Sequence, residues 1–307
     1  MLDFRMKTFL KVCECMNFTR AAEELNITQP AVSQHVRYLE SYYKVRLFDY
    51  EGKKLRLTEQ GELLHSAALT MMHDEQSLKS RLTHLPAGKQ DVRFGATMTV
   101  GEVVMPEVLK AYLSTYPEVQ LHMEVANTQE LLKRLDAGNI DFAIVEGFFK
   151  KTEYDFLHYS TEKFVAVCCP SYCFQKKPRR LEDMFVERLL LREPGSGTRE
   201  VLERFLDSQN YGLEDFEKIA EIGNLHTLKE LAKAGLGITF LYKIAVRKEL
   251  ENGELKLIKL ENCQIYHDFT FIWPRESIYA EFYRGLFRQF TGVSSSEQLR
   301  HIKGREL

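Results

Sequence analysis

The sequence predicts a mixed α/β protein in three parts: an N-terminal winged helix-turn-helix, a long linker helix, and an α/β domain with two lobes. Two short helical segments precede a capped helix over residues 27–42. A helical run of about 25 residues follows, and it is too long for the small module before it to cover. From residue 91 onward, strand-like and helical runs alternate, which is typical of parallel sheets. We expect domain boundaries at 1–58, 59–88 and 89–307.

The composition is that of an ordinary globular protein. The chain has 307 residues, of which 44% are hydrophobic and 28% charged, so each of two domains can bury a core. It lacks a run of about 18 apolar residues and a signal-peptide core at its start, so we expect no membrane contact and a cytoplasmic location. A formal net charge of −2 argues against indiscriminate coating of nucleic acid, but it allows a local basic surface.

Residues 27–42 form the helix around which the N-terminal module is organised. Thr28 can cap its start and Pro30 sits in the first turn, where a missing N–H costs nothing. Apolar residues at helical spacing predict a buried stripe of Val32, Val36, Leu39 and Tyr43. Another face carries groups that can read base edges and hold phosphates, namely Gln29, Ser33, Gln34 and Arg37. Taken alone, this would be an amphipathic helix with a solvated polar face.

The neighbours of this helix favour a role in DNA binding. Helices predicted at residues 4–16 and 19–25 precede it, which is the helix-turn-helix order. Short strands at 45–48 and 54–57 would form a hairpin wing around residues 49–53. Its basic residues can contact the sugar-phosphate backbone, and they are Lys53, Lys54 and Arg56. The alternative is that these basic side chains are only solvated, as is usual in a turn.

The long helix, over residues 58–82, needs a partner. Its start at Thr58 looks capped, and residues 86–88 should end it and mark the linker. An antiparallel second copy would bury its apolar residues, and a two-fold dimer would present two recognition helices to two DNA half-sites. These apolar residues are Leu63, Leu64, Ala67, Met71, Met72, Leu78 and Leu82.

The N-terminal 60 residues carry a specific motif pattern. It comprises residues 18–22, Leu25, residues 28–33, Leu39-Glu40, Leu47-Phe48 and Leu57-Thr58 with Gly61, and it resembles the signature of LysR-type transcriptional regulators. Lys44 and Tyr50 depart from it, standing where the family usually has Gly and Arg. The resemblance implies double-stranded promoter DNA as a partner and a homotetramer built on the homodimer, with a contact to RNA polymerase left open. From the helix face, the wing and this resemblance together, we expect DNA contacts from Thr28, Gln29, Pro30, Ser33, Gln34, Arg37, Lys53, Lys54 and Arg56.

In the C-terminal part, predicted strands at 91–96, 119–125 and 140–145 alternate with helices at 102–116 and 128–137, after a turn at 97–101. A parallel sheet binds ligands beyond the carboxyl ends of its strands. Polar residues fall at those ends, namely Thr97, Thr99, Asn127 and Glu146. Each alone could be a cap or turn residue, but their convergence on one edge favours a pocket.

A second set of elements begins with strands at 164–168 and 188–191. The loop 192–199 then places Ser196, Gly197 and Thr198 at a helix N-terminus, which favours an anion, the alternative being a Gly-rich turn with a hydroxyl cap. Segments 219–222, 224–234 and 237–241 predict a further βαβ unit, and 269–273 with a helix at 278–290 return to the first set. Two crossings leave a cleft between lobe I (89–162 and 268–307) and lobe II (163–267).

This arrangement is similar to the effector domain of LysR-type regulators, which is like a periplasmic binding protein. The motifs at 138–141, 146–147, 192–199 and 234–238 resemble members that govern sulfur assimilation or carbon fixation. The resemblance implies a small anionic metabolite as inducer, in a cleft lined by Thr97, Met98, Thr99, Ser196, Gly197, Thr198 and residues 224–226. Asn224 and His226 differ from the small and acidic residues expected there, so the inducer can differ too.

An enzyme is the alternative class. His226 and Glu146 could supply an acid and a base, but their spacing does not demand it. A redox sensor is one hypothesis for the cysteines at 168, 169 and 173. The alternative is that they are structural, because cysteines at a strand end are typically buried small hydrophobic residues. We expect no catalysis, cofactor or metal. The remaining alternative is a two-lobed sensor or enzyme whose N-terminal module mediates protein contacts.

Overall fold

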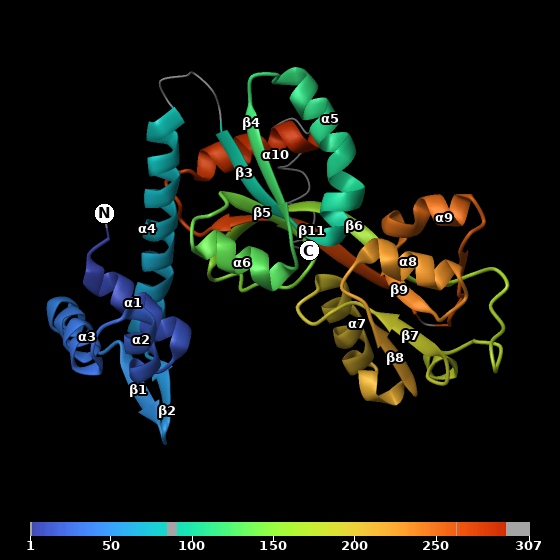
Figure 1. Ribbon diagram of the computed structural model, residues 1–307, viewed down its shortest axis with the longest axis horizontal. Coiled ribbons are helices and arrows are strands. Elements are labelled where there is room, and N and C mark those ends of the chain that lie inside the picture. Colours follow the sequence, from blue (N-terminus) through green and yellow to red (C-terminus); the bar gives the residue numbers. More distant parts are fainter. Residues whose placement is uncertain (1, 85–90, 262, 293–307) are drawn as a thin grey trace, which may run out of the picture.

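The computed structural model describes residues 2–84, 91–261 and 263–292. Figure 1 shows a small helical module at one end, the long helix α4 rising from it, and an α/β body beside α4 that continues into a second lobe. Within the described ranges, no helix combines the length and the apolar character needed to cross a membrane.

The N-terminal module packs three helices around one core: α1 (Phe4–Cys15), α2 (Phe18–Leu25) and α3 (Gln29–Tyr43). Side-chain oxygens of Asp3, Asn17 and Thr28 cap the three starts, so the predicted Thr28 cap is confirmed. Small residues on α2 allow the close approach of its neighbours. The core includes Phe9, Val12, Ala21, Ala22, Val32, Val36, Leu39 and Leu47.

Two details of this module differ from the prediction. Tyr43, the last residue of α3, is 44% exposed, and its ring contacts Tyr42 (centroids 5.0 Å apart) and is not part of the core. Lys44 then ends the helix in a left-handed conformation (φ 57°). The first wing strand is β1 (Phe48–Glu51), not 45–48; it pairs with β2 (Lys54–Leu57). The segment before β1 is instead tied to α3, since the Leu47 amide donates to Glu40 Oε1 at 2.9 Å.

Helix α4 (Glu59–His84) begins as predicted, with the Thr58 hydroxyl accepting a hydrogen bond from the Gly61 amide at 3.0 Å. One of its faces packs on α1 and another on lobe I. Part of the predicted apolar stripe is left exposed within the chain: Leu63 (74%), Met71 (56%), Leu78 (44%) and Leu82 (58%). The predicted helix end at 86–88 lies outside the described residues.

Lobe I is built on a mixed sheet of strand order β10-β6-β11-β5-β3-β4, in which β10 is Lys256–Leu257, and β9 (Thr239–Tyr242) also pairs with β6. β3 (Asp91–Ala96), β4 (Gln120–Val125) and β5 (Phe142–Val145) are parallel, whereas β6 (Tyr154–Cys168) and β11 (Ile265–Pro274) are antiparallel to each other. Aromatic stacking fills the core, with ring centroids 5.0 Å apart for Phe94 and Phe142 and 4.4 Å apart for Phe142 and Phe271.

The helices of lobe I are α5 (Met105–Thr115), α6 (Thr128–Asp136) and α10 (Ala280–Thr291). The predicted turn at 97–101 is wrong. Helical conformation starts at Met98, directly after β3, and a wide turn, η2 (Val100–Val104), leads into α5. The predicted strands at 164–168 and 269–273 are parts of the longer β6 and β11, which run across the molecule in Figure 1.

Lobe II has a small parallel sheet of β7 (Arg188–Leu191) and β8 (Lys218–Glu221), with α7 (Gly197–Ser208), α8 (Leu225–Lys233) and α9 (Arg247–Glu251). Short 3-10 turns are η3 (Leu181–Met184), η4 (Leu213–Asp215) and η5 (Lys243–Val246). Only the start of the predicted strand at 237–241 belongs to this small sheet. Ile238 bridges Leu189 in parallel, whereas β9 (Thr239–Tyr242), like β10 (Lys256–Leu257), pairs antiparallel with β6.

Candidate nucleic-acid interface and ligand site

The polar face of α3 is accessible to a partner. Gln34 and Arg37 are exposed, and Gln29 donates a hydrogen bond from Nε2 to Ser33 Oγ at 2.9 Å. The Thr28 hydroxyl is engaged in capping, because it accepts from the Ala31 amide. Together with Pro30 in the first turn, it fixes where the helix begins. The face therefore presents two amides, a hydroxyl and a guanidinium from one rigid helix.

The three basic residues of the wing are all exposed, but they are not equivalent. Arg56 Nη1 lies 3.2 Å from Glu51 Oε2 across the β1–β2 hairpin, so part of its charge is already compensated. Within the described residues, Lys53 and Lys54 have no carboxylate at ion-pair distance. The two lysines are therefore the less compensated cations of this hairpin.

A second candidate site lies where the two lobes meet. We name it the polar cluster, and it comes from the ends of β3, β5 and β7 and the starts of α6 and α7. Every member is at most 2% exposed. The members are Thr97, Thr99, Thr128, Glu146, Arg192, Ser196 and Thr198.

Glycines allow the lobes to approach closely at this cluster. A Cβ atom on Gly197 would lie 2.7 Å from the Gly147 amide nitrogen, so the start of α7 touches the chain just after β5. Gly195 has a φ of +85°, and a Cβ there would lie 3.4 Å from Asn127 Nδ2. The loop 192–199 and the strand ends of lobe I therefore face each other, as the sequence predicts.

Several buried polar atoms of the cluster have no hydrogen-bond partner among the described residues. They are the hydroxyls of Thr97, Thr128 and Ser196, Oε2 of Glu146 and Nη1 of Arg192. Buried polar groups are nearly always hydrogen-bonded, so a group of such atoms at one place is typical of a ligand site. Ser196 occupies the cap position of α7, but its side chain makes no cap hydrogen bond, so the alternative of a hydroxyl-capped turn is wrong.

The charges of the cluster are one cation and one carboxyl group. Burial raises the pKa of Glu146, although hydrogen bonds from the Thr99 and Thr198 hydroxyls (2.9 Å for Thr198) and the charge of Arg192 act in the opposite direction. Arg192 donates through Nε and Nη2 to the Glu193 carboxylate at 2.8 and 2.9 Å. Its Nη1 is the donor that remains for a ligand.

Not every predicted ligand-binding residue joins this cluster. Met98 is half-buried and packs against the main core. Asn127 lies at the edge of the cluster and caps α6, accepting from the Glu130 amide at 2.9 Å. Asn224 caps α8 through the Thr227 amide, and His226 is exposed, so these two side chains serve local roles in the described chain.

Thr128 and Arg192 are cluster members that the sequence analysis did not select. Thr128 was interpreted only as the first residue of a helix, and Arg192 only as part of the loop motif. Arg192 directly follows β7, so the same rule that selected Glu146 after β5 would have selected it. Thr128 carried no comparable signal, because a threonine at a helix start is usually a capping residue.

Two of the three cysteines considered for a redox role are packed inside the protein. Cys168 and Cys169 are buried, Cys173 is exposed, and all are free thiols. Burial raises the pKa of Cys168 to about 11, which disfavours the reactive thiolate. Over the part of the chain that the structure describes, no group of three or more His, Cys, Asp or Glu side chains is arranged to hold a metal ion.

Family models match both parts of the chain. The model described as "Bacterial regulatory helix-turn-helix protein, lysR family" matches residues 4–62, and "LysR substrate binding domain" matches residues 87–290. The regulator CysL of Bacillus subtilis is 28% identical over 270 residues, covering 87% of this chain and 89% of CysL. A probable RuBisCO transcriptional regulator of Thalassiosira pseudonana is 26% identical over 281 residues, covering 89% of this chain and 91% of its own.

Solved structures agree in fold. A cysteine mutant of OxyR from Corynebacterium glutamicum gives a TM-score of 0.59 at 22% identity, covering 94% of this chain and 90% of that one. The regulatory domain of Synechocystis CcmR gives a TM-score of 0.59 at 16% identity, covering 67% of this chain and 98% of the CcmR domain. The predicted fold class and the resemblance to the sulfur and carbon-fixation regulators are confirmed. The chain belongs to the LysR family of DNA-binding transcriptional regulators, with an N-terminal helix-turn-helix and a two-lobed effector-binding domain.

Proposed function

We propose that this regulator binds promoter DNA through α3 and the β1–β2 wing and responds to a small anion held in the polar cluster. The single observation that carries the effector part is the set of buried, unpartnered hydrogen-bonding atoms gathered between the two lobes. A regulator of this kind acts on chromosomal promoters, so we infer a cytoplasmic location and no catalytic role.

On the DNA side, we assign base reading to Gln29, Ser33, Gln34 and Arg37, which share one face of α3. Amides and guanidinium groups suit base edges in the major groove. Lys53, Lys54 and Arg56 would hold phosphates beside it, and Thr28 and Pro30 would set the helix start at the backbone. Gel shifts on the DNA upstream of its own gene test this assignment. Folded protein that fails to bind any DNA at low salt would contradict it.

On the effector side, the available donors favour an oxyanion. Arg192 Nη1 carries positive charge, the α7 N-terminus adds its dipole, and the hydroxyls of Thr97, Thr128 and Ser196 can donate. Glu146 opposes an anion only while it is charged, and the raised pKa makes its protonated, donating form more accessible. The contact between Gly147 and Gly197 favours a small ligand over a bulky one.

Thermal shift with sulfate, sulfite, thiosulfate, inorganic phosphate and small phosphate esters tests the effector class. At least one of these anions should raise the melting temperature in a concentration-dependent way, since a ligand that binds only the folded state stabilises it. Ser196→Ala and Thr128→Val should weaken that effect, and His226→Ala serves as the matched control on an exposed side chain. If the anion raised the melting temperature of all three variants equally, its binding site would lie outside the polar cluster.

We also propose that α4 forms a homodimer, which would assemble further into a homotetramer, with a contact to RNA polymerase left open. Its exposed apolar residues Leu63, Met71, Leu78 and Leu82 support the dimer, because such a stripe is costly to leave in water. Light scattering of Leu63→Lys and Met71→Lys should give a smaller assembly than Gln76→Lys, an exposed polar control on the same helix. We retain the domain limits 1–58, 59–88 and 89–307, which limited proteolysis can test.

A further inference from the structure

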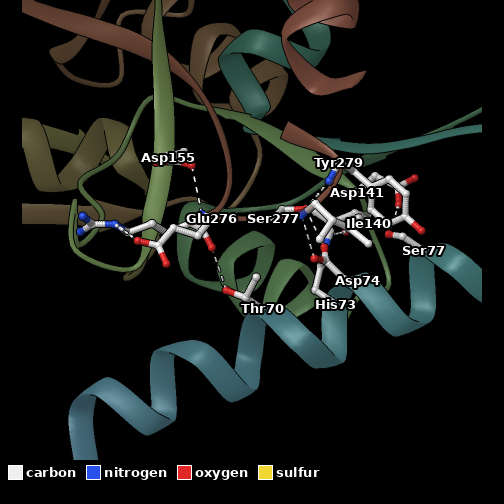
Figure 2. A network of polar contacts seen from close by, with 12 residues as sticks. Thr70, His73, Asp74, Ser77, Ile140, Asp141, Asp155, Glu276, Ser277 and Tyr279 are labelled. Atoms are coloured by element: carbon white, nitrogen blue, oxygen red, sulfur yellow. Dashed lines mark hydrogen bonds and ion pairs between the residues drawn. The ribbon is translucent and has the colours of Figure 1, made fainter. Parts of the chain in front are cut away.

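The linker helix α4 is held on lobe I by a buried polar contact, drawn in Figure 2. We name it the α4 joint, and it consists of His73, Asp74 and Ser77 on α4 with Asp141, Ser277 and Ile278 on lobe I. Figure 2 shows the side chains of His73, Asp74 and Ser77 pointing from α4 toward the residues of lobe I. His73, Asp74, Ser77, Asp141 and Ser277 are all buried.

Asp74 is the centre of the joint. Its Oδ1 accepts from the Ser277 hydroxyl at 2.6 Å and its Oδ2 accepts from the Ile278 amide at 3.0 Å. Burial disfavours its charge, but hydrogen bonds from His73, Ser277 and Ile278 outweigh burial and lower the pKa of Asp74. One carboxylate therefore fixes α4 to the segment that follows β11.

Ser77 makes the second attachment, to the start of β5. Its hydroxyl donates to Asp141 Oδ1 at 2.8 Å, and Arg93 Nη2 donates to the same oxygen at 2.9 Å. His73 Nε2 lies 3.2 Å from the Ile140 carbonyl oxygen. Gly138, with a φ of +71°, lets the chain pass close to α4, since a Cβ there would lie 2.8 Å from Gln76 Cβ.

The polar character of this contact gives it two distinct states. Breaking one hydrogen bond would leave a buried carboxylate or hydroxyl without a partner, which is costlier than parting two apolar surfaces by the same distance. Partly opened arrangements of the joint are therefore disfavoured relative to the intact joint and to a joint fully opened to water.

β5 connects this joint directly to the polar cluster. Asp141 immediately precedes β5 and Glu146 immediately follows it, about 17 Å away along an extended strand. All four residues of β5 are buried, and the strand lies between β11 and β3 in the sheet. Helix α6 adds a parallel connection, since Thr128 is its first residue and its far end leads to Gly138. A shift at Glu146 cannot be absorbed within such a short, packed strand.

We propose that the α4 joint is the element that couples the polar cluster to the DNA-binding module, with β5 as the rigid connection and Asp74 as the positioning residue. The inference rests on the proposed function, which assigns ligand binding to the polar cluster and DNA binding to the N-terminal module. A ligand at Glu146 would favour one of the two states of the joint and so change how α4 carries the paired recognition helices.

Hydrogen exchange of the full chain, followed by mass spectrometry, tests the joint without knowledge of the ligand. In Asp74→Asn and in Ser277→Ala, residues 70–82 should exchange about tenfold faster than in the wild type, because a buried charge-assisted hydrogen bond is weakened or lost. Gln76→Ala, exposed and adjacent to the joint, keeps its Cβ and should exchange as the wild type does. Ser277→Ala removes only a hydroxyl, so this variant still tests the joint if Asp74→Asn does not fold.

The coupling is tested by adding Glu146→Gln. This change should alter the amide hydrogen-exchange rate of residues 70–82 by about threefold or more in the wild-type and Gln76→Ala backgrounds. It should leave that rate unchanged in the Asp74→Asn background. Unaltered exchange in the wild-type background, or the same change in Asp74→Asn, would overturn the proposal. Gel shifts on the same variants report DNA binding separately, so failure of the proposed function is distinguishable from failure of the coupling.

Discussion

The Thr198 hydroxyl donates a hydrogen bond of 2.9 Å to Oε1 of Glu146, and this bond joins the first turn of α7 in lobe II to the end of β5 in lobe I. Both side chains are buried. The bond therefore reports how closely the lobes approach at the polar cluster, and a change in either residue affects the polar cluster and the lobe contact together.

Glu146→Gln should change how stability depends on pH. Burial raises the folded-state pKa of Glu146 above 4.5, so the folded wild type holds this proton more tightly than the unfolded chain. Wild-type stability should fall, relative to the variant, as the pH rises from about 4.5 through the folded pKa. Thermal melts over this range measure the difference, and parallel curves for the two proteins would contradict the assignment.

Asp136→Asn should have a similar effect with a defined window. Burial raises the pKa of Asp136 to about 6, despite the hydrogen bond of 2.6 Å from the Tyr154 hydroxyl. The wild type should lose roughly 1 to 2 kcal/mol relative to the variant between about pH 4 and pH 6, a figure reduced because the residue is only half-buried. Denaturant titrations at several pH values check this.

Gly197→Ala should destabilise the contact between the lobes. The new Cβ would lie 2.7 Å from the Gly147 backbone nitrogen, which cannot move aside as a flexible side chain can. We expect a loss of about 1 to 3 kcal/mol, typical of overpacking, and a weaker response to any stabilising anion. Gly223→Ala is the matched control, since nothing lies within 4 Å of a Cβ there. Equal melting temperatures for the two variants would rule out a tight lobe contact.

Lys54→Ala should weaken DNA binding more than Arg56→Ala. Arg56 is already paired with Glu51 at 3.2 Å and has less charge to offer a phosphate. We expect Lys54→Ala to reduce the salt dependence of the binding constant by about one unit in the log–log slope, equally on specific and random DNA. Fluorescence anisotropy at several salt concentrations measures the slope. A larger reduction for Arg56→Ala would mean that the pair with Glu51 breaks on binding.

The sequence was sufficient for features encoded locally. The Thr28 cap, the apolar residues Val32, Val36 and Leu39, and the strand-end position of Glu146 follow from spacing alone, and they are found as predicted. The prediction that Tyr43 is buried was wrong, because spacing assigns a side chain to a helix face but does not show how far along the helix other elements cover that face. Asn224 and His226 were selected by resemblance, and their surroundings in this chain are those of a helix cap and an exposed side chain.

The α4 joint could not be found from sequence patterns. Asp74 meets Ser277, which is 203 residues away, and Ser77 meets Asp141, which is 64 residues away. On a helix, an isolated Asp and Ser look like solvated polar residues, and only the docking of lobe I buries them. The same holds for Arg192, whose significance lies in the single donor left free after its pairing with Glu193.

The affinity of the full chain for its own upstream DNA, compared with a shuffled fragment, tests the central claim most directly. The wild type should prefer the upstream fragment, and Arg37→Ala should lose about 1 to 3 kcal/mol on that fragment with a much smaller loss on the shuffled one. Equal affinity of the wild type for both fragments, or no binding to either at low salt by folded protein, would contradict the assignment of α3 as a sequence-reading helix.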